Sequence, residues 1–368
     1  MRYLKVRGAQ RRIPSTVEGV EDIRPRGDRE EQILGACSNS YQHNVWKAEQ
    51  DGKTNRRGKR AVQTLYNRTG GSGGKTLQEK IEHILITSPC CPMVGIVNTD
   101  AWLNDPDLMY IRKDNKIVNN VIDTWQQKTC RWTIFDFNTF YSHEACTPLF
   151  WAGYRVFDHV YYSVEQSLEY CEELLKYQFN DDNNMVRQFL QDCFDVFERR
   201  IPKLGTLAIK SMPNAGKNWF MEIFLDFYWN RGQLGQLTRH NLFGLQEACG
   251  KRILLWDEPN YEPGMIETLK NVTAGHPYTV RVKQQADCAV YSTPLIILTN
   301  NDLSLFHNDA FTTRIRKYLW KPCAMLADKD KKPNPLCVYP LMLKWGIILP
   351  SPYNMIDSVI DIDDDLFE

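Results

Sequence analysis

The sequence lacks an excess of charge of either sign and lacks a long apolar run. Its 368 residues include 45 Lys and Arg and 45 Asp and Glu, so the formal net charge is zero. This balance excludes a whole-chain bias toward nucleic acid, and any such site must be a local patch or a channel built from several subunits. No run approaches the roughly 20 apolar residues of a membrane span, and the polar, basic start has no signal-peptide core. We expect a cytoplasmic or nuclear protein with no membrane partner.

Cysteine motifs are also absent. The 11 cysteines include no CxxC pair, and Cys90 and Cys91 are the one adjacent pair. An odd number of scattered cysteines argues against a disulfide framework and a zinc ribbon, and favours a reducing compartment. We therefore expect no disulfide partner.

The composition of the chain predicts four segments. Residues 1–75 are polar, rich in Arg, Lys, Gly and Asn, and predict a basic, largely disordered segment or linker. Their cluster RRGKR, residues 56–60, fits a nuclear-localisation or phosphate-binding patch, and equally a solvated charge run. Residues 76–200 repeat apolar side chains at helical spacing, which predicts a helical domain. Residues 201–322 alternate short apolar runs with helical segments, which predicts an α/β domain around a central parallel sheet. Residues 323–368 form a C-terminal extension with an acidic tail.

A candidate phosphate loop lies at the start of the α/β segment. A short apolar strand at residues 207–209 runs into SMPNAGKN, residues 211–218, and then into a helix. In a P-loop, backbone N–H groups wrap phosphate oxygens and the lysine faces the β- and γ-phosphates. The candidate ATP-binding residues are Pro213, Asn214, Ala215, Gly216, Lys217 and Asn218. Ser211 replaces the usual Gly and Asn218 the usual Ser or Thr, although an amide oxygen is also a hard ligand for Mg²⁺. On its own, the pattern is equally consistent with a P-loop and with a chance Gly-Lys pair at the start of a helix.

A second stretch competes for this role. In TGGSGGKT, residues 69–76, Lys75 is followed by Thr76, a better magnesium ligand than Asn. However, no apolar strand precedes it, Thr69 stands in place of the first Gly, and the glycine-serine run is typical of a linker. We favour the later loop, because an acidic strand follows it at the expected distance.

That strand lies in RILLWDEP, where four apolar residues end in Asp257 and Glu258, forty positions after Lys217. An Asp at the carboxyl end of a strand can hold the Mg²⁺–water shell, and an adjacent Glu can polarise the attacking water. We predict Asn218 and Asp257 as metal ligands and Glu258 as the catalytic base. Two surface acids at the end of a strand are the alternative.

A basic hairpin is predicted next. TVRVK, residues 279–283, alternates apolar and basic side chains, and a strand would place Arg281 and Lys283 on one face. A polar turn and a second short strand at residues 289–291 complete the hairpin. Its cations suit a nucleic-acid backbone, although a solvated edge strand has the same pattern.

Another apolar strand, residues 294–300, ends in Asn300. In a P-loop ATPase this strand lies between the phosphate loop and the acidic strand, where Asn300 orients the hydrolytic water and senses the γ-phosphate. Fourteen residues later, Arg314 offers a guanidinium that can reach across a subunit interface, with Arg316 as the alternative.

The order of these elements resembles the superfamily 3 helicases of small DNA viruses, and more closely the replication initiators of densovirus-type parvoviruses. PNAGKN, RILLWDEPNYE, TPLIILTNN and RIRKYLW carry the resemblance over residues 205–320. A weaker likeness covers residues 102–108 and 163–179. In that branch Asn commonly follows the P-loop Lys, as Asn218 does here, whereas Ser211 departs from the pattern.

The resemblance implies an α/β P-loop NTPase fold. This would be an AAA+-like superfamily 3 helicase core, with a central parallel sheet flanked by helices and preceded by a helical collar that serves oligomerisation. It implies ATP and Mg²⁺ as cofactors, single-stranded or forked DNA as partner, a hexamer-like ring and the host cell nucleus. Four side chains are assigned to catalysis: Lys217, Glu258, Asn300 and Arg314. Lys283, with Arg281 in support, is assigned to DNA.

One module of the family is missing. Its members carry an upstream nickase with a His-hydrophobic-His metal pair and a nucleophilic tyrosine. No two of His43, His83, His143 and His159 form that pair, so we expect no nicking activity in this chain. A fragment, a spliced product and an endogenous viral remnant all fit this expectation.

Two rival functions stay open. A P-loop packaging-type ATPase would lack the basic hairpin. A non-catalytic DNA-binding or assembly subunit with a decayed ATPase would tolerate Ser211 and the missing nickase.

Overall fold

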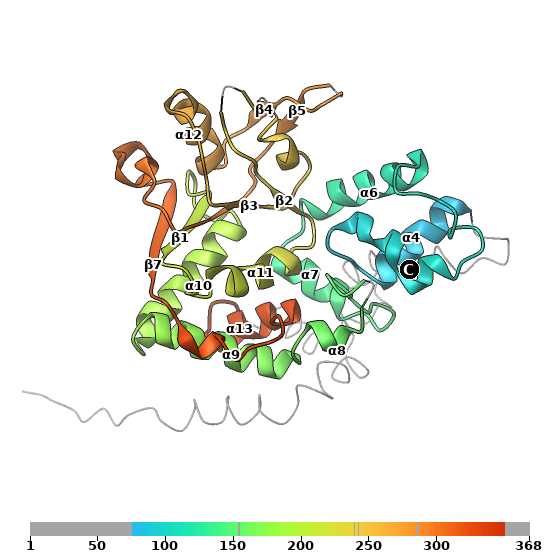
Figure 1. The fold of residues 1–368 in the computed structure, drawn as a ribbon, viewed down its shortest axis with the longest axis horizontal. Helices are drawn as coiled ribbons and strands as arrows, with labels where there is room; N and C mark the ends of the chain where they lie inside the picture. Colours follow the sequence, from blue (N-terminus) through green and yellow to red (C-terminus); the bar gives the residue numbers. More distant parts are fainter. Residues whose placement is uncertain (1–75, 154, 239, 242, 285, 350–368) are drawn as a thin grey trace, which may run out of the picture. The chain divides into compact units, whose positions relative to one another are not determined.

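The structure, a computed structural model, begins with helices and continues into a parallel sheet (Figure 1). It describes residues 76–153, 155–238, 240–241, 243–284 and 286–349. The predictions for the basic segment, its RRGKR cluster, Lys75 and the acidic tail lie outside the described residues. None of the helices in the described ranges is long and apolar enough to cross a bilayer.

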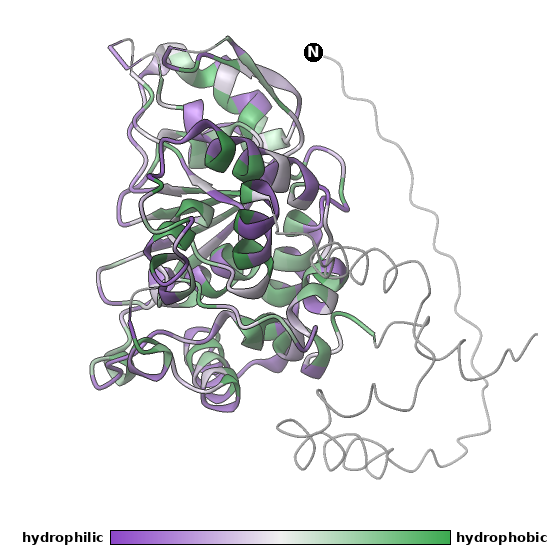
Figure 2. Ribbon diagram, turned by 90° about the vertical axis from the view of Figure 1, so that its right-hand side faces the viewer, coloured by the Kyte–Doolittle hydropathy of each residue, from purple (hydrophilic) through white to green (hydrophobic). Residues whose placement is uncertain are grey.

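The segment before the sheet is helical, as predicted. Its longer helices are α4 (Leu77–Thr87), α6 (Lys116–Thr129), α7 (Ile134–Tyr141), α9 (Val164–Gln178) and α10 (Asn183–Phe197). The shorter ones are η1 (Met93–Asn98), α5 (Asp100–Leu103) and α8 (Phe157–Val160). The apolar stripe expected on α10 is buried, with Phe189 and Phe197 at 0% exposure. Figure 2 shows such helices banded with apolar and polar residues, as expected for helices with one buried side.

Thr76, which belongs to the competing glycine-rich stretch, caps helix α4. Its hydroxyl accepts the Glu79 N–H at 3.3 Å, and the Glu79 carboxylate accepts the Thr76 N–H at 2.8 Å. This reciprocal pair is a capping box, which satisfies two N–H groups that the first helical turn leaves without partners. The stretch therefore leads into a helix through a capping threonine.

Five parallel strands form the main sheet in the order β2-β3-β6-β1-β7. They are β1 (Thr206–Ser211), β2 (Arg231–Gln233), β3 (Ile253–Asp257), β6 (Leu295–Thr299) and β7 (Ile315–Trp320). Strand β6, which precedes Asn300, lies between β1 and β3, the position expected from the sequence. Because the strands are parallel, their carboxyl ends meet at one edge, where open α/β sheets bind their ligands.

Helices and turns connect these strands. α11 (Lys217–Phe227) follows β1, and α12 (Ile266–Ala274) follows β3. A two-stranded antiparallel sheet of β4 (Tyr278–Val280) and β5 (Cys288–Val290) precedes β6. The remaining elements are η2 (Gln246–Ala248), η3 (Pro263–Met265), η4 (Ser304–His307), η5 (Asp309–Phe311), η6 (Ala324–Leu326), η7 (Pro335–Cys337) and α13 (Val338–Lys344). The predicted fold class, an α/β P-loop NTPase fold preceded by a helical region, is confirmed.

Two hydrophobic clusters cover the two faces of the sheet. Alternate residues of a strand point to opposite faces, so Leu207 joins one cluster and Ala208 the other. The first cluster contains the buried side chains of the helical segment, α11 and α13, whereas the second contains those of α12 and the hairpin. In Figure 1, α12, β4 and β5 accordingly lie across the sheet from α9 and α13. The helical segment thus packs directly on the sheet.

One disulfide contradicts the sequence prediction. Cys249, which follows η2, is bonded to Cys288 on β5, 39 residues further along the chain. Their Cα atoms lie 6.3 Å apart, within the range that a disulfide spans. The expectation of no disulfide partner is wrong, because the number and spacing of cysteines do not reveal which distant segments the fold brings together.

Candidate active site

The loop between β1 and α11 has a backbone that suits phosphate binding. Gly216 has φ +84° and precedes the first residue of α11, so N–H groups of the helix start are open toward a ligand. A Cβ atom at Gly216 would collide with Leu326 and lie 3.2 Å from Leu174 Cδ2, so only glycine fits. Asn214 is also left-handed, with φ +63°. Ser211 is the last residue of β1, paired with Trp320, and its departure from the P-loop pattern therefore falls in the strand.

Lys217 is the first residue of α11, and it reaches the ends of two strands. Its Nζ atom lies 2.5 Å from Asn300 Oδ1 and 3.5 Å from Glu258 Oε1. Its side chain is only 9% exposed, which strengthens its interactions with nearby charges. Three residues chosen from separate motifs are thus brought into direct contact. The loop before Lys217 contains Asn214, Ala215 and Gly216, and both Pro213 and Asn214 are exposed.

The Glu258 carboxylate is held by the end of β6. The Asn300 N–H donates to both carboxylate oxygens at 3.0 Å, the Thr299 hydroxyl to Oε2 at 3.3 Å, and Asn301 Nδ2 to Oε2 at 3.4 Å. Asp257 pairs with Leu298 in the parallel register, and this pairing brings the two strand ends together. Glu258 itself has φ +46°, an uncommon conformation for a side-chain-bearing residue that recurs at functional sites. The sequence reasoning missed Thr299 and Asn301, although the Thr-Asn-Asn run was visible.

Asp257 and Asn218 face each other at the same edge. Asn218 Nδ2 donates to Asp257 Oδ2 at 3.2 Å. Burial raises the pKa of Asp257, and the hydrogen bond from Asn218 opposes that rise. A half-turn of the amide would present its oxygen to a cation. Mg²⁺ commonly uses one or two carboxylates together with substrate phosphates, so this donor set fits it.

The basic hairpin differs from its prediction. Strand β4 ends at Val280, which pairs with Cys288, so Arg281 and Lys283 lie in the connecting segment. The alternation of TVRVK continues past the point where cross-strand pairing stops, because the chain turns at Gln284 with φ +60°. Both cations are exposed. The segment therefore carries its charges at the tip of the hairpin, apart from the phosphate loop.

The two candidate arginines lie at the amino edge of the sheet. The Arg314 carbonyl accepts the N–H groups of Gly205 and Thr206, beside the start of β1. The phosphate loop begins at the other end of this six-residue strand, about 20 Å away. The structure therefore does not bring Arg314 together with Lys217. The Arg314 guanidinium donates to the Ala310 carbonyl.

Arg316 has a different partner. Its Nε atom lies 3.3 Å from Asp192 Oδ1 on α10. The Tyr318 hydroxyl donates to the same carboxylate at 2.7 Å. Arg316 is thus paired with a nearly buried carboxylate of its own chain, just as the Arg314 guanidinium is bonded to the Ala310 carbonyl.

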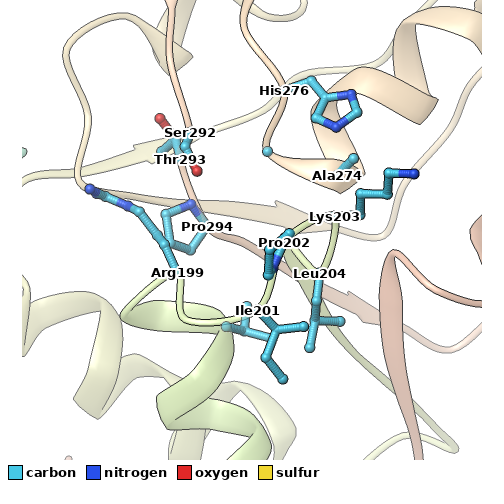
Figure 3. A pocket seen from close by; sticks show the side chains of 13 residues that line it. Arg199, Ile201, Pro202, Lys203, Leu204, Ala274, His276, Ser292, Thr293 and Pro294 are labelled. Carbon is cyan, nitrogen blue, oxygen red and sulfur yellow. The ribbon is translucent and has the colours of Figure 1, made fainter.

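A cavity of about 330 Å³ lies at this amino edge as well, next to Gly205 (Figure 3). Its lining includes the basic residues Arg199, Lys203 and His276. Burial and the neighbouring Arg252 lower the pKa of Arg199 to about 10. The cavity is separated from the phosphate loop by the length of β1, so it is not the nucleotide site.

Comparison with known proteins identifies relatives. The chain is 34% identical over 363 residues to the initiator protein NS1 of Junonia coenia densovirus, and 34% identical over 361 residues to that of Diatraea saccharalis densovirus. Each match covers 94% of this chain and 64% of the relative. The initiator protein NS1 of human parvovirus B19 (isolate AU) is 23% identical over 145 residues, 36% of this chain and 21% of that protein.

Other comparisons add less. No family model matches the chain. A solved structure of JCV helicase with a bound small molecule is 12% identical, with a TM-score of 0.47 over 83% of this chain and 92% of that one. The chain spans 64% of the length of the two densovirus proteins, and over that length it is similar to the densovirus initiator proteins NS1.

Proposed function

We propose that the chain is an ATP-dependent DNA helicase that acts in replicating the genome of a small single-stranded DNA virus. The observation that carries the proposal is the contact of Lys217 with Asn300 and Glu258, at 2.5 and 3.5 Å, at the carboxyl edge of a parallel sheet. Similarity to densovirus initiators supports a role in viral DNA replication, and hence in the host cell nucleus.

The side chains divide the work of ATP hydrolysis. Mg²⁺–ATP, when bound, supplies a γ-phosphoryl group whose charge the metal helps to neutralise. Lys217 adds a positive charge beside the phosphates, and Asp257 with Asn218 supplies oxygen ligands for the cation. Glu258 accepts a proton from the attacking water. Asn300 uses Oδ1 to accept from Lys217, which leaves its Nδ2 group to donate to the γ-phosphate or the water.

The test of this assignment is release of phosphate from ATP with and without single-stranded DNA. We expect Mg²⁺-dependent hydrolysis that single-stranded DNA accelerates. Absence of hydrolysis together with intact DNA binding would instead favour a DNA-binding or assembly subunit. Hydrolysis that DNA does not affect would favour an ATPase with another task.

Lys283→Ala should weaken DNA binding while basal ATP hydrolysis continues. Lys283 is exposed in the hairpin tip, away from the phosphate loop, so its loss removes a phosphate contact without touching the chemistry. The slope of log affinity against log salt should fall by roughly one counterion per site. The matched control is Lys270→Ala on α12, whose ammonium is already paired with Glu267 at 2.7 Å. Equal DNA affinities and salt slopes for the two variants would indicate that the hairpin is solvent-exposed and does not contact DNA.

We further propose that the chain assembles into a ring in which Arg314 completes a neighbour's ATP site. Arg314 lies about 20 Å from its own phosphate loop, a distance its side chain cannot span. A planar guanidinium suits the developing charge on a γ-phosphate better than an ammonium does. Arg314 and the phosphate loop lie at opposite edges of the sheet. This arrangement is compatible with a head-to-tail interface between subunits.

Mixing Arg314→Ala chains with Lys217→Ala chains should restore part of the ATPase activity that each variant lacks alone. At one type of mixed interface, an intact phosphate loop meets an intact arginine, because each chain supplies a different half of the site. Turnover per chain should also rise with protein concentration. If Arg314→Ala is silent, Arg316→Ala is examined in the same mixture. Failure of both mixtures, with turnover independent of concentration, would exclude a shared site.

A further inference from the structure

The helical segment makes a side-chain hydrogen bond to the phosphate loop. Gln178, the last residue of α9, is 6% exposed and lies against the loop. Its Nε2 atom donates to the Ala215 carbonyl at 3.0 Å and to the Lys321 carbonyl at 2.8 Å. Its Oε1 atom accepts the Lys321 N–H at 2.8 Å. One side-chain amide therefore joins three segments that are distant in sequence.

The orientation of this amide follows from its partners. The backbone N–H of Lys321 can only donate, so the atom that faces it must be Oε1. The carbonyl oxygens of Ala215 and Lys321 can only accept, so the atom that faces them must be Nε2. A half-turn of the amide would lose all three hydrogen bonds. Gln178 is thus specified by hydrogen bonding as well as by size.

The bond to Ala215 sets the direction of the next N–H group. The peptide unit is planar, and the Ala215 carbonyl and the Gly216 N–H belong to the same unit and point in opposite directions. Anchoring the carbonyl on Gln178 therefore turns the Gly216 N–H toward the other side of the loop. A second anchor acts on the preceding unit, because the Cys323 N–H donates to the Asn214 carbonyl at 2.9 Å.

Packing contacts hold the phosphate loop in addition to these hydrogen bonds. Leu174 lies one helical turn before Gln178, and it contacts the position that a Cβ atom at Gly216 would occupy. Leu326, which follows the Lys321 segment, also contacts that position. The loop therefore sits between α9 and the chain that follows β7, and any displacement of α9 changes the loop directly.

We propose that Gln178 is a positioning residue of the phosphate loop, which aims the loop N–H groups at bound phosphates and couples nucleotide binding to the position of α9. This inference rests on the proposed ATPase function, since it assigns a role to the same site. Gln178 touches no reacting atom in this role, and it acts through the Ala215–Gly216 peptide unit. The coupling gives the helical segment a direct mechanical link to the nucleotide.

The decisive variant is Q178E. The new carboxylate keeps an acceptor for the Lys321 N–H, but it places a negative oxygen against the carbonyls of Ala215 and Lys321 where a donor stood. We expect affinity for a fluorescent ATP analogue with Mg²⁺ to fall at least about fivefold at pH 8. Turnover at saturating ATP should fall less than affinity, because the catalytic groups on β3 and β6 are unchanged.

The pH dependence of Q178E separates positioning from a general loss of stability. Burial and the two facing carbonyl oxygens raise the pKa of the introduced carboxyl above its ordinary value. Below that pKa the carboxyl is protonated and donates again, so affinity relative to wild type should rise as the pH is lowered from 8. The matched control is Q166E on the same helix, where Gln166 caps the first turn by accepting the Ser163 N–H at 3.3 Å. Q166E should bind the analogue like wild type at each pH.

The outcomes distinguish a failure of the proposed ATPase function from a failure of the positioning role of Gln178. A wild-type chain that does not bind the analogue contradicts the proposed ATPase function itself. Wild-type binding with equal affinity in Q178E and Q166E overturns the positioning role, as does a loss in Q178E that does not lessen at any lower pH at which the wild type still binds. Amide hydrogen exchange gives a second readout that does not depend on activity. In Q178E, exchange should accelerate at residues 215–218 but not in the first turns of α9, and uniform acceleration along α9 also overturns the proposal.

Discussion

Lys217→Ala should reduce ATP turnover by about 100-fold or more while leaving the fold intact. Lys217 supplies the one ammonium that the structure places between the phosphate loop, Glu258 and Asn300 among the described residues. Alanine removes this charge from a nearly buried position, where no water-exposed lysine can replace it. Steady-state phosphate release measures the loss, and circular dichroism checks the fold.

Lys75→Ala is the matched control for this prediction, since it removes the lysine of the competing glycine-rich stretch. The neighbouring Thr76 is engaged in capping α4, which favours a linker role for that stretch. Full activity in Lys75→Ala beside a loss in Lys217→Ala is the expected pair of results. The reverse pair would mean that the phosphates bind at the earlier stretch.

Glu258→Gln should bind ATP with unchanged affinity and hydrolyse it about 100- to 10,000-fold more slowly. The amide keeps the size of the side chain but cannot accept the proton of the attacking water. The amide also places an NH₂ group near the Asn300 N–H, which in the wild type donates to both carboxylate oxygens. The hydrogen bonds from the end of β6 are therefore weakened as well. Single-turnover hydrolysis and equilibrium binding of nucleotide measure the two quantities separately.

Asp257→Asn is the matched comparison, because it makes the same chemical change one residue earlier. Its effect should fall on the concentration of Mg²⁺ needed for activity, since Asp257 is the residue expected to serve the metal. A loss of nucleotide affinity in Glu258→Gln with unchanged turnover would contradict the assignment of Glu258 as the base.

The strands around the site could be predicted because their signals are local. Apolar runs of four or five residues that lead into Asp257-Glu258 or into Thr299-Asn300 indicate buried parallel strands, and parallel strands bring such ends to one edge. The contact of Lys217 with Glu258 and Asn300 follows from that rule. The roles assigned to these residues and the collar role of residues 76–200 stay predictions.

Other features depended on contacts between distant segments. The Cys249–Cys288 bond requires the η2 loop to meet the hairpin, and the hydrogen bonds of Gln178 require α9 to meet the segments that follow β1 and β7. The hairpin was predicted too long, because alternation of side chains continued where strand pairing had ended at Val280. Periodicity reports which face a side chain prefers, and it does not report where a neighbouring strand stops.

Unwinding of a forked DNA duplex is the most direct test of the proposed helicase activity. A duplex with single-stranded arms, labelled on one strand, is mixed with the chain and Mg²⁺, with ATP, with a non-hydrolysable analogue, or with no nucleotide. We predict strand separation by the wild-type chain only when ATP is present, and none by Lys217→Ala or Glu258→Gln under the same conditions. Separation that proceeds equally without hydrolysis, or ATP hydrolysis that never separates the strands, would contradict it.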